Sequence, residues 1–308
     1  MAPQLRQAVL SIQGRLAAVA DAKTRAWWTN YVKGANFRGV NMAGVRKVVH
    51  TAQKDLALET WTPAARLDLC MALLGETMTE DKMAAILYMQ EVLLPQGEPN
   101  WESTVARLGQ AFAAGSVADW HVCDWLCVKV LGHLVKAHGE PCAQALSGWQ
   151  RAGPLWQRRA SCVAFVNLAK EGDCGNFPGF STMLLQNCRQ LVSAGPGERF
   201  AQTGAGWVLR ELSRAERAKV VQLLEACAAE GLLSAEGMRY ATEKMGSSEQ
   251  KRLQGKLKLG EQRISSRSAS SSTSNDEKKS PPPRGKDQHD SKATSRGRGS
   301  GKGKKGGG

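Results

Sequence analysis

One acidic residue stands out because of the stretch in which it lies. Asp124 sits in VADWHVCDWLCVKVLGHLV, residues 117–135, which is apolar on nearly every side when it is drawn as a helix. A carboxylate in such surroundings is costly unless it is paired or hydrogen-bonded. Trp120 precedes Asp124 by one helical turn on the same face. We therefore treat Asp124 as the first candidate for a functional group.

Three other stretches carry residues that could act with an acid. NYVKGANFRGVNMAGVRKVV (30–49) predicts a helix, a tight turn and a second helix, with basic residues near the turn. LWQRRASCVAFV (155–166) places two arginines at the start of an apolar helix, and FAQTGAGWVLREL (200–212) has glycines that would let a backbone or a ligand come close. The side chains of interest in these stretches are Tyr31, Lys33, Phe37, Arg38, Arg46, Lys47, Arg158, Arg159, Trp207 and Arg210.

Each of these residues also has a structural explanation. Trp120 and Trp207 could be core aromatics, Arg159 could neutralise a buried Asp, and Tyr31 could pack between helices. The common catalytic motifs are missing: the sequence has no GxxxxGK[ST] loop, GxSxG elbow, HExxH or Rossmann glycine set. Eight cysteines form no CxxC pair, so we expect buried reduced thiols and no metal site. Any chemistry must rest on carboxylates, arginines and aromatics, and no cofactor is expected.

The elements that must position these residues are helices. Residues 1–246 show apolar positions spaced three and four apart, and no alternating pattern of a strand. Thr62-Pro63 and Ser234 have the sequence of helix starts. About a dozen helices with short loops predict an all-α fold. Helix pairs every 35–45 residues or so favour a HEAT-like helical repeat solenoid with an extended concave face that suits a long ligand. A helical bundle is the alternative architecture.

The chain divides by charge into a domain (1–246) and a tail (247–308). From residue 247 onward there are 16 Lys/Arg and 6 Asp/Glu, a net charge of +10, which leaves +4 for residues 1–246. The tail has no Phe, Trp or Tyr, so we expect it to be disordered and to add salt-dependent affinity for phosphates. It could also be a nuclear localisation signal or a solubilising segment without a partner.

The amphipathic start of the chain and the lack of a long apolar run predict a soluble, intracellular protein without a membrane partner. Its compartment would be the nucleus in a eukaryote and otherwise the cytoplasm.

The acid, the arginine and the aromatics together resemble the DNA alkylation repair family of HEAT-like-repeat alkylpurine DNA glycosylases, the AlkD type. The resemblance covers most of residues 25–246. Its most specific motif, Gly-Trp-Val-Leu-Arg-Glu, stands unchanged at 206–211. The other similar motifs, in the family's order, are Tyr31 with Lys33, Phe37 and Gly39-Val40, then Trp120 to Asp124, then Trp156 to Arg159.

The resemblance implies a role for each matching position. Asp124 would be the catalytic carboxylate, Trp120 and Trp207 would cradle the sugar-phosphate of the lesion, and Arg159 would contact phosphate beside them. Tyr31 would form a further wall of the cleft. The residues that we expect to grip DNA phosphates are Tyr31, Lys33, Arg38, Arg46, Lys47, Arg158 and Arg210.

The implied activity is hydrolysis of the N-glycosidic bond of N3- or N7-alkylated purines in double-stranded DNA, by a monomer that does not flip the base into a pocket. Two positions depart from the family pattern. His121 stands where the central motif has its first Asp, and Asn41-Met42-Ala43 follows the Gly-Val turn where the family commonly has Pro. The alternative function is a non-catalytic HEAT-like scaffold that binds DNA or a protein partner.

Overall fold

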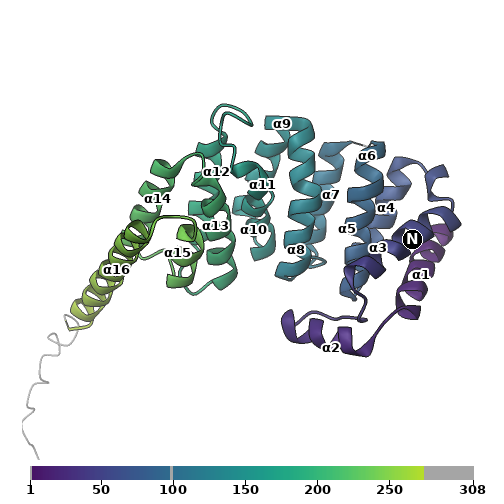
Figure 1. The fold of residues 1–308 in the computed structure, drawn as a ribbon, viewed down its shortest axis with the longest axis horizontal. Coiled ribbons are helices and arrows are strands. Elements are labelled where there is room, and N and C mark those ends of the chain that lie inside the picture. The colour runs from purple at the N-terminus through teal and green to yellow at the C-terminus, as the bar shows by residue number, and fades with distance from the viewer. Residues whose placement is uncertain (1, 98–99, 274–308) are drawn as a thin grey trace, which may run out of the picture. The chain divides into compact units, whose positions relative to one another are not determined.

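The chain folds into a row of packed helices (Figure 1). The computed structural model describes residues 2–97 and 100–273. Within those ranges it contains no strand, only one isolated bridge between Asn36 and Met78. The α-helices are α1 Pro3–Ala18, α2 Ala22–Tyr31, α3 Met42–Asp55, α4 Pro63–Leu74, α5 Thr79–Tyr88, α6 Leu94–Gln96, α7 Trp101–Ala113, α8 Trp120–Leu126, α9 Gly132–Ser147, α10 Leu155–Val163, α11 Val166–Ala169, α12 Phe180–Val192, α13 Arg199–Leu212, α14 Arg217–Ala229, α15 Ala235–Thr242 and α16 Ser247–Thr273.

Four shorter segments join some of these helices. Two are 3₁₀ turns, η1 Leu58–Thr60 and η4 Gly148–Arg151, and two are π-helical, η2 Met89–Leu93 and η3 Cys127–Leu131. The π-helical segment η3 follows directly on α8, the helix that carries Asp124. Because π-bulges often accompany functional sites, this irregularity agrees with the importance given to that helix.

The helix starts follow the capping chemistry of the sequence. The Thr62 side chain accepts a hydrogen bond from the backbone N–H of Ala65, with Pro63 at the first helical position of α4. Ser234 does the same for Gly237 at the start of α15, so both predicted starts are confirmed. Asn41 caps α3 by accepting from the N–H of Gly44, which explains how this helix begins without a proline.

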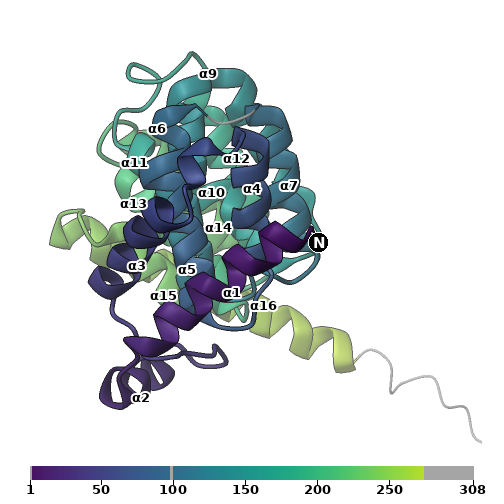
Figure 2. The ribbon, with the colours of Figure 1, turned by 90° about the vertical axis from the view of Figure 1, so that its right-hand side faces the viewer.

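Successive helices pack against their neighbours along the row. α4 packs on α5, α7 on α9, α10 on α12 and α13, and α13 on α15. Seen from the right-hand side of Figure 1, the same helices lie one behind another (Figure 2). One continuous apolar cluster runs from α1 to α16. The prediction of an all-α helical repeat fold is confirmed.

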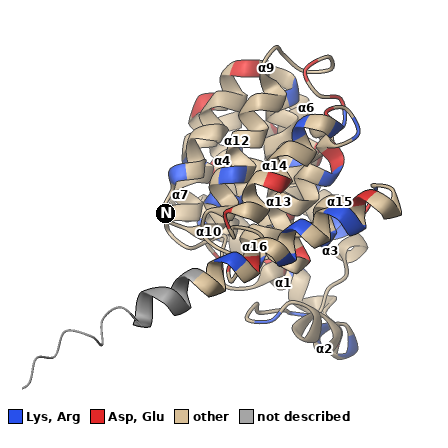
Figure 3. Ribbon diagram, turned by 90° about the vertical axis from the view of Figure 1, so that its left-hand side faces the viewer, with Lys and Arg blue, Asp and Glu red and all other residues tan. Residues whose placement is uncertain are grey.

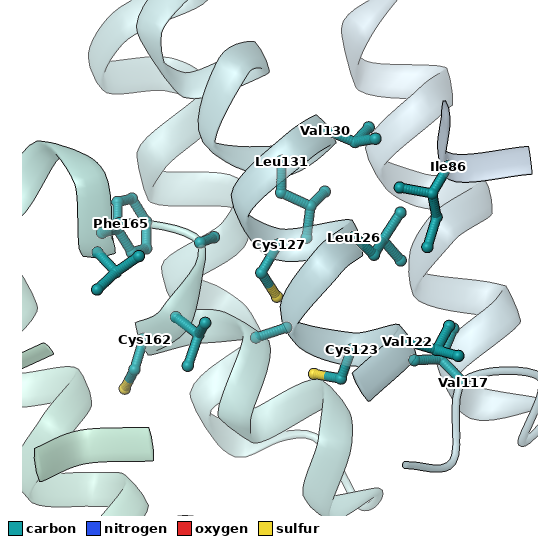
Figure 4. Close-up of a cluster of buried hydrophobic side chains, with 14 of the residues drawn as sticks. Ile86, Val117, Val122, Cys123, Leu126, Cys127, Val130, Leu131, Cys162 and Phe165 are labelled. Atoms are coloured by element: carbon teal, nitrogen blue, oxygen red, sulfur yellow. The ribbon is translucent and has the colours of Figure 1, made fainter. Parts of the chain in front are cut away.

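The centre of this core is built on α8 and η3. Val122, Cys123, Leu126 and Cys127 are fully buried. Figure 4 shows them between Ile86 on one side and Phe165 on the other. Trp120, Asp124 and Val128, which are spaced four apart, are only partly buried. The helix is therefore apolar almost all round because it is an inner element, with one stripe left open.

α2 stands outside this core. None of its residues is buried, and it lies away from the row of helices (Figure 1). Its start is held by the backbone N–H of Asp21, which donates to the carbonyl of Gly39 at 2.9 Å. Gly39 has φ +100°, and a Cβ there would collide with the carbonyl of Asp21. The Gly39-Val40 motif thus serves a close approach between two backbones.

The helical unit extends further than the expected boundary at residue 246. α16 begins at Ser247, and Leu253 and Leu257 on it are buried, so the compact unit runs from Met1 to Ser265. Two leucines one turn apart give this polar segment an apolar face to pack, although it has no aromatic residue. The tail that we expected from residue 247 therefore starts later, and 274–308 lie outside the described residues.

None of the eight cysteines, which all lie in the described residues, forms a disulfide, and all but Cys174 are buried. No described helix combines the length and the apolar character that crossing a membrane requires.

Candidate active site

Asp124 lies against Arg159, which comes from the middle of α10. The guanidinium donates Nε to Oδ1 and Nη2 to Oδ2 of Asp124, both at 2.8 Å, which is the bidentate geometry of a strong ion pair. Nη1 of Arg159 donates to the carbonyl of Phe200 at 2.5 Å. The Arg159 side chain is 5% exposed and that of Asp124 is 15% exposed, so the acid is the partner that reaches solvent.

The ion pair holds Arg159 in its charged form. Burial lowers the pKa of Arg159, but the charge and the hydrogen bonds of Asp124 outweigh it, and the pKa lies above its ordinary value. The purely structural explanation of Arg159, that it neutralises a buried acid, therefore holds in part, because the two side chains form an ion pair. The acid is nevertheless not sealed off, because it borders a cavity.

The cavity has a volume of about 330 Å³ and contains the four residues expected at the reaction centre. Trp120 and Trp207, both partly buried, border it together with Asp124 and Arg159. Tyr31 on α2 closes one side, with its ring edge-on to Trp120 at 5.4 Å between centroids. The complete lining is Tyr31, Trp120, Asp124, Arg159, Arg199, Phe200, Thr203, Trp207 and Tyr240.

A second hollow adjoins this cavity. It has a volume of about 340 Å³ and shares Trp120, Asp124 and Trp207 with the first. Trp125, Val128 and Lys129 are among its other walls, and the Lys129 ammonium lies 5.6 Å from the centre of the Trp125 ring. The acid and the two tryptophans thus lie where two concavities meet.

Glycines of α13 make the site possible. A Cβ at Gly204 would lie 2.6 Å from Nη1 of Arg159, so only glycine leaves room for the guanidinium. A Cβ at Gly206 would lie 2.7 Å from Cβ of Tyr240 and 2.8 Å from the carbonyl oxygen of Gly237, so this glycine lets α15 pack on α13. The expectation that these small residues permit a close approach is confirmed at both positions.

His121, the departure from the family motif, lines the second hollow together with Asp124 but does not line the cavity that contains Arg159. Its ring is 5% exposed and packs against Trp28 at 4.8 Å, with Phe37 stacked on the same indole at 5.5 Å. Burial lowers the pKa of His121, against the opposing charges of Asp119, Asp124 and Glu80, so the ring is neutral at pH 7. The substitution therefore supplies an aromatic surface that anchors α2.

Among the residues expected to contact phosphate, Arg38 has a structural partner instead. Its guanidinium donates to both oxygens of Asp81, at 3.2 and 2.6 Å, and Asp81 is fully buried. The neighbouring acid, Glu80, accepts the backbone N–H groups of Arg38, Gly39 and Val40. Two consecutive acids on α5 thus hold the turn after α2. Arg38 is already paired in this structure, and its contact with a DNA phosphate stays a prediction.

The other basic residues are spread over several helices. Arg46 pairs with Glu91 at 2.7 Å, and Arg210 pairs with Glu211 at 3.0 Å and Glu243 at 2.6 Å. Arg158 donates to the carbonyls of the loop before α10, namely Ala152 and Gly153. Lys33 and Lys47 are exposed. None of these five expected cations lines the cavity that contains Asp124, and neither does Arg38.

Four residues of the cavity were missing from the sequence prediction. Phe200 and Thr203 lie seven and four residues before Trp207, on the same face of α13, so helical periodicity could have found them. Arg199 begins that helix and is paired with Glu236 at 2.9 Å. Tyr240 belongs to α15, and no periodic pattern in the sequence links that helix to the site.

The arrangement is suited to stabilising positive charge. A solvent-reaching carboxylate lies between two indoles, whose electron-rich faces also favour cations. In the part of the chain that the structure describes, no group of three or more His, Cys, Asp or Glu could hold a metal ion.

Comparisons with known proteins agree with this fold. The model of a family described as DNA alkylation repair enzyme matches residues 12–245. A solved structure described as a predicted DNA alkylation repair enzyme from Enterococcus faecalis is similar, with a TM-score of 0.58 and 20% sequence identity. The similarity covers 74% of this chain and 97% of that one. No curated protein matches the sequence. Because the family match spans most of the helical unit, this chain belongs to the DNA alkylation repair enzyme family.

Proposed function

We propose that this protein is a DNA glycosylase that removes positively charged N3- or N7-alkylated purines from duplex DNA. The observation that carries the proposal is the position of Asp124, a solvent-reaching carboxylate held by Arg159 between Trp120 and Trp207. A scaffold protein has no need of an acid at the floor of an aromatic cavity.

The chemistry follows from the charge of the substrate. Alkylation at N3 or N7 leaves the purine cationic, so its glycosidic bond is weakened and the base is a good leaving group. As the bond breaks, the deoxyribose becomes oxocarbenium-like. The Asp124 carboxylate stabilises this cation and orients or deprotonates the attacking water. One carboxylate is enough because the leaving base needs no proton.

The remaining cavity residues have supporting roles in this proposal. Trp120, Trp207 and Tyr31 hold the sugar-phosphate of the damaged nucleotide, while Arg159 holds the acid in place and adds positive charge for phosphate. The enzyme grips the backbone and does not insert the damaged base into a pocket. Lys33 and Lys47, which are exposed, contribute to the phosphate grip outside the cavity.

The proposal is tested by offering duplexes that carry N7-methylguanine, which is cationic, or O6-methylguanine, which is neutral. We expect release of the first base and not of the second, with separation of the free base as the readout. If duplex is bound but neither base is released, the protein is a non-catalytic scaffold that binds DNA. Release of both bases would contradict the role given to the lesion's charge.

A further inference from the structure

Two adjacent tryptophans on α2 have different surroundings. Trp28 turns toward the helical row, where it packs on Phe37 at 5.5 Å and on His121 at 4.8 Å. Trp27 is 57% exposed and stacks on Tyr31, which is 56% exposed, with 5.0 Å between ring centroids and 25° between planes. Trp28 therefore anchors the helix, and the outer face of Trp27 has no such structural task.

The exposed ring is continuous with the candidate active site. Trp27 stacks on Tyr31, and Tyr31 meets Trp120 edge-on at 5.4 Å. Tyr31 and Trp120 line the cavity that contains Asp124. A row of three rings thus leads from the acid out to the surface of α2. Contiguous exposed apolar surface is typical of binding sites, whereas single exposed apolar residues are ordinary.

The charges around the row identify the class of partner. Residues 22–54 contain seven Lys and Arg and no Asp or Glu. Figure 3 shows blue but no red on α2. Lys23, Arg25 and Lys33 are exposed on and after this helix. Flat aromatic faces among cations are typical of surfaces that stack unpaired nucleobases beside a bound phosphate backbone.

We propose that Trp27 stacks on the base that pairs with the alkylated purine, once that base has left the duplex stack. This inference rests on the proposed function and specifies how its DNA substrate is bound. If the backbone of the damaged nucleotide is held at Asp124, the base that loses its partner is the one opposite. The exposed indole face gives that base a stacking surface without enclosing it. Trp27 is thus a residue that recognises the disrupted base pair.

The experiment measures binding to two duplexes that contain a tetrahydrofuran abasic analogue. In the first duplex the opposite nucleotide is cytosine, and in the second it is also tetrahydrofuran. Because the analogue has no base to release, the outcome does not depend on glycosylase activity. Wild type should bind the first duplex about 10-fold more tightly, since stacking on an aromatic side chain favours a base by that order.

Trp27→Ala should reduce this ratio to near one, and Trp27→Phe should restore most of it. Thr29→Ala, at an exposed position of the same helix, is the matched control and should keep the wild-type ratio. Circular dichroism checks that the variants are folded. Three results would each overturn the proposal: a wild-type ratio near one, a ratio that Trp27→Ala leaves unchanged, or an equal loss of affinity for both duplexes. The last result would place Trp27 on the sugar-phosphate backbone.

Discussion

Breaking the ion pair between Asp124 and Arg159 should destabilise the protein, and replacing Arg159 should cost more stability than replacing Asp124. Arg159→Met keeps most of the apolar stem but leaves a carboxylate that is only 15% exposed without its cation. Removing one partner of such a pair costs about 3–5 kcal/mol. Since some water reaches Asp124, we expect a value of about 3 kcal/mol. At about 2–4 °C per kcal/mol for a domain of this size, the melting temperature should fall by about 10 °C.

Asp124→Asn should cost less. The asparagine oxygen still accepts one hydrogen bond, and the guanidinium keeps the carbonyl of Phe200 as an acceptor. The loss is that of a charged hydrogen bond, about 1.5–3 kcal/mol. In the double variant no buried charge lacks its partner, so the two effects should not add. We expect a coupling free energy of about 2 kcal/mol.

Thermal and urea denaturation of the four proteins measure this cycle. The pair of Arg38 and Asp81, which is buried and lies outside the cavity, provides a matched control for stability without a role in the site. If the effects of Arg159→Met and Asp124→Asn add to within about 0.5 kcal/mol, the two side chains are not coupled and the geometry given to the site is wrong.

Other predictions follow from single positions. Gly204→Ala should push the Arg159 guanidinium aside and slow base release at least 10-fold with helicity retained, whereas Gly14→Ala, which meets nothing within 4 Å, should stabilise its helix by about 0.5–1 kcal/mol. Since burial lowers the pKa of His121 from 6.5, the unfolded chain binds more protons below about pH 6.5. The melting temperature should therefore fall as the pH drops through that value, and it should fall less steeply in His121→Phe. If the melting temperature depended equally on pH in both proteins, folding would not lower the pKa of His121. Removing residues 274–308 should weaken duplex binding mainly at low salt and leave the single-turnover rate at saturating enzyme unchanged. A large loss of that rate would show that the segment acts in the reaction.

The sequence was sufficient for the fold, and it singled out residues that the structure brings together. Helical periodicity and capping residues predicted the helices. Five residues of the matching motifs line one cavity, namely Tyr31, Trp120, Asp124, Arg159 and Trp207. Asp124 could be singled out because its cost inside an apolar helix required a partner, which is Arg159.

The surface cations could not be placed in the same way. Arg38 was expected on DNA, but its partner Asp81 comes 43 residues later, and no local pattern indicates which acid a given arginine meets. Arg46 and Arg210 likewise pair with acids distant in the sequence, Glu91 and Glu243, and their contact with DNA phosphates stays a prediction. Tyr240 was missed because α15 reaches the cavity only through the packing that Gly206 allows. Contacts between distant helices decide these positions.

The chemistry assigned to Asp124 is the central claim, and its most direct test combines rate with affinity. Single-turnover release of N7-methylguanine should be measured for wild type, Asp124→Asn and the control Asp81→Asn, together with duplex affinity. We expect Asp124→Asn to lower the rate by about 100- to 1,000-fold with affinity nearly unchanged, which is the loss of a group that stabilises a developing charge. Asp81→Asn should keep the wild-type rate. A wild-type rate in Asp124→Asn, or a parallel loss of rate and affinity, would contradict the claim and make Asp124 a structural residue.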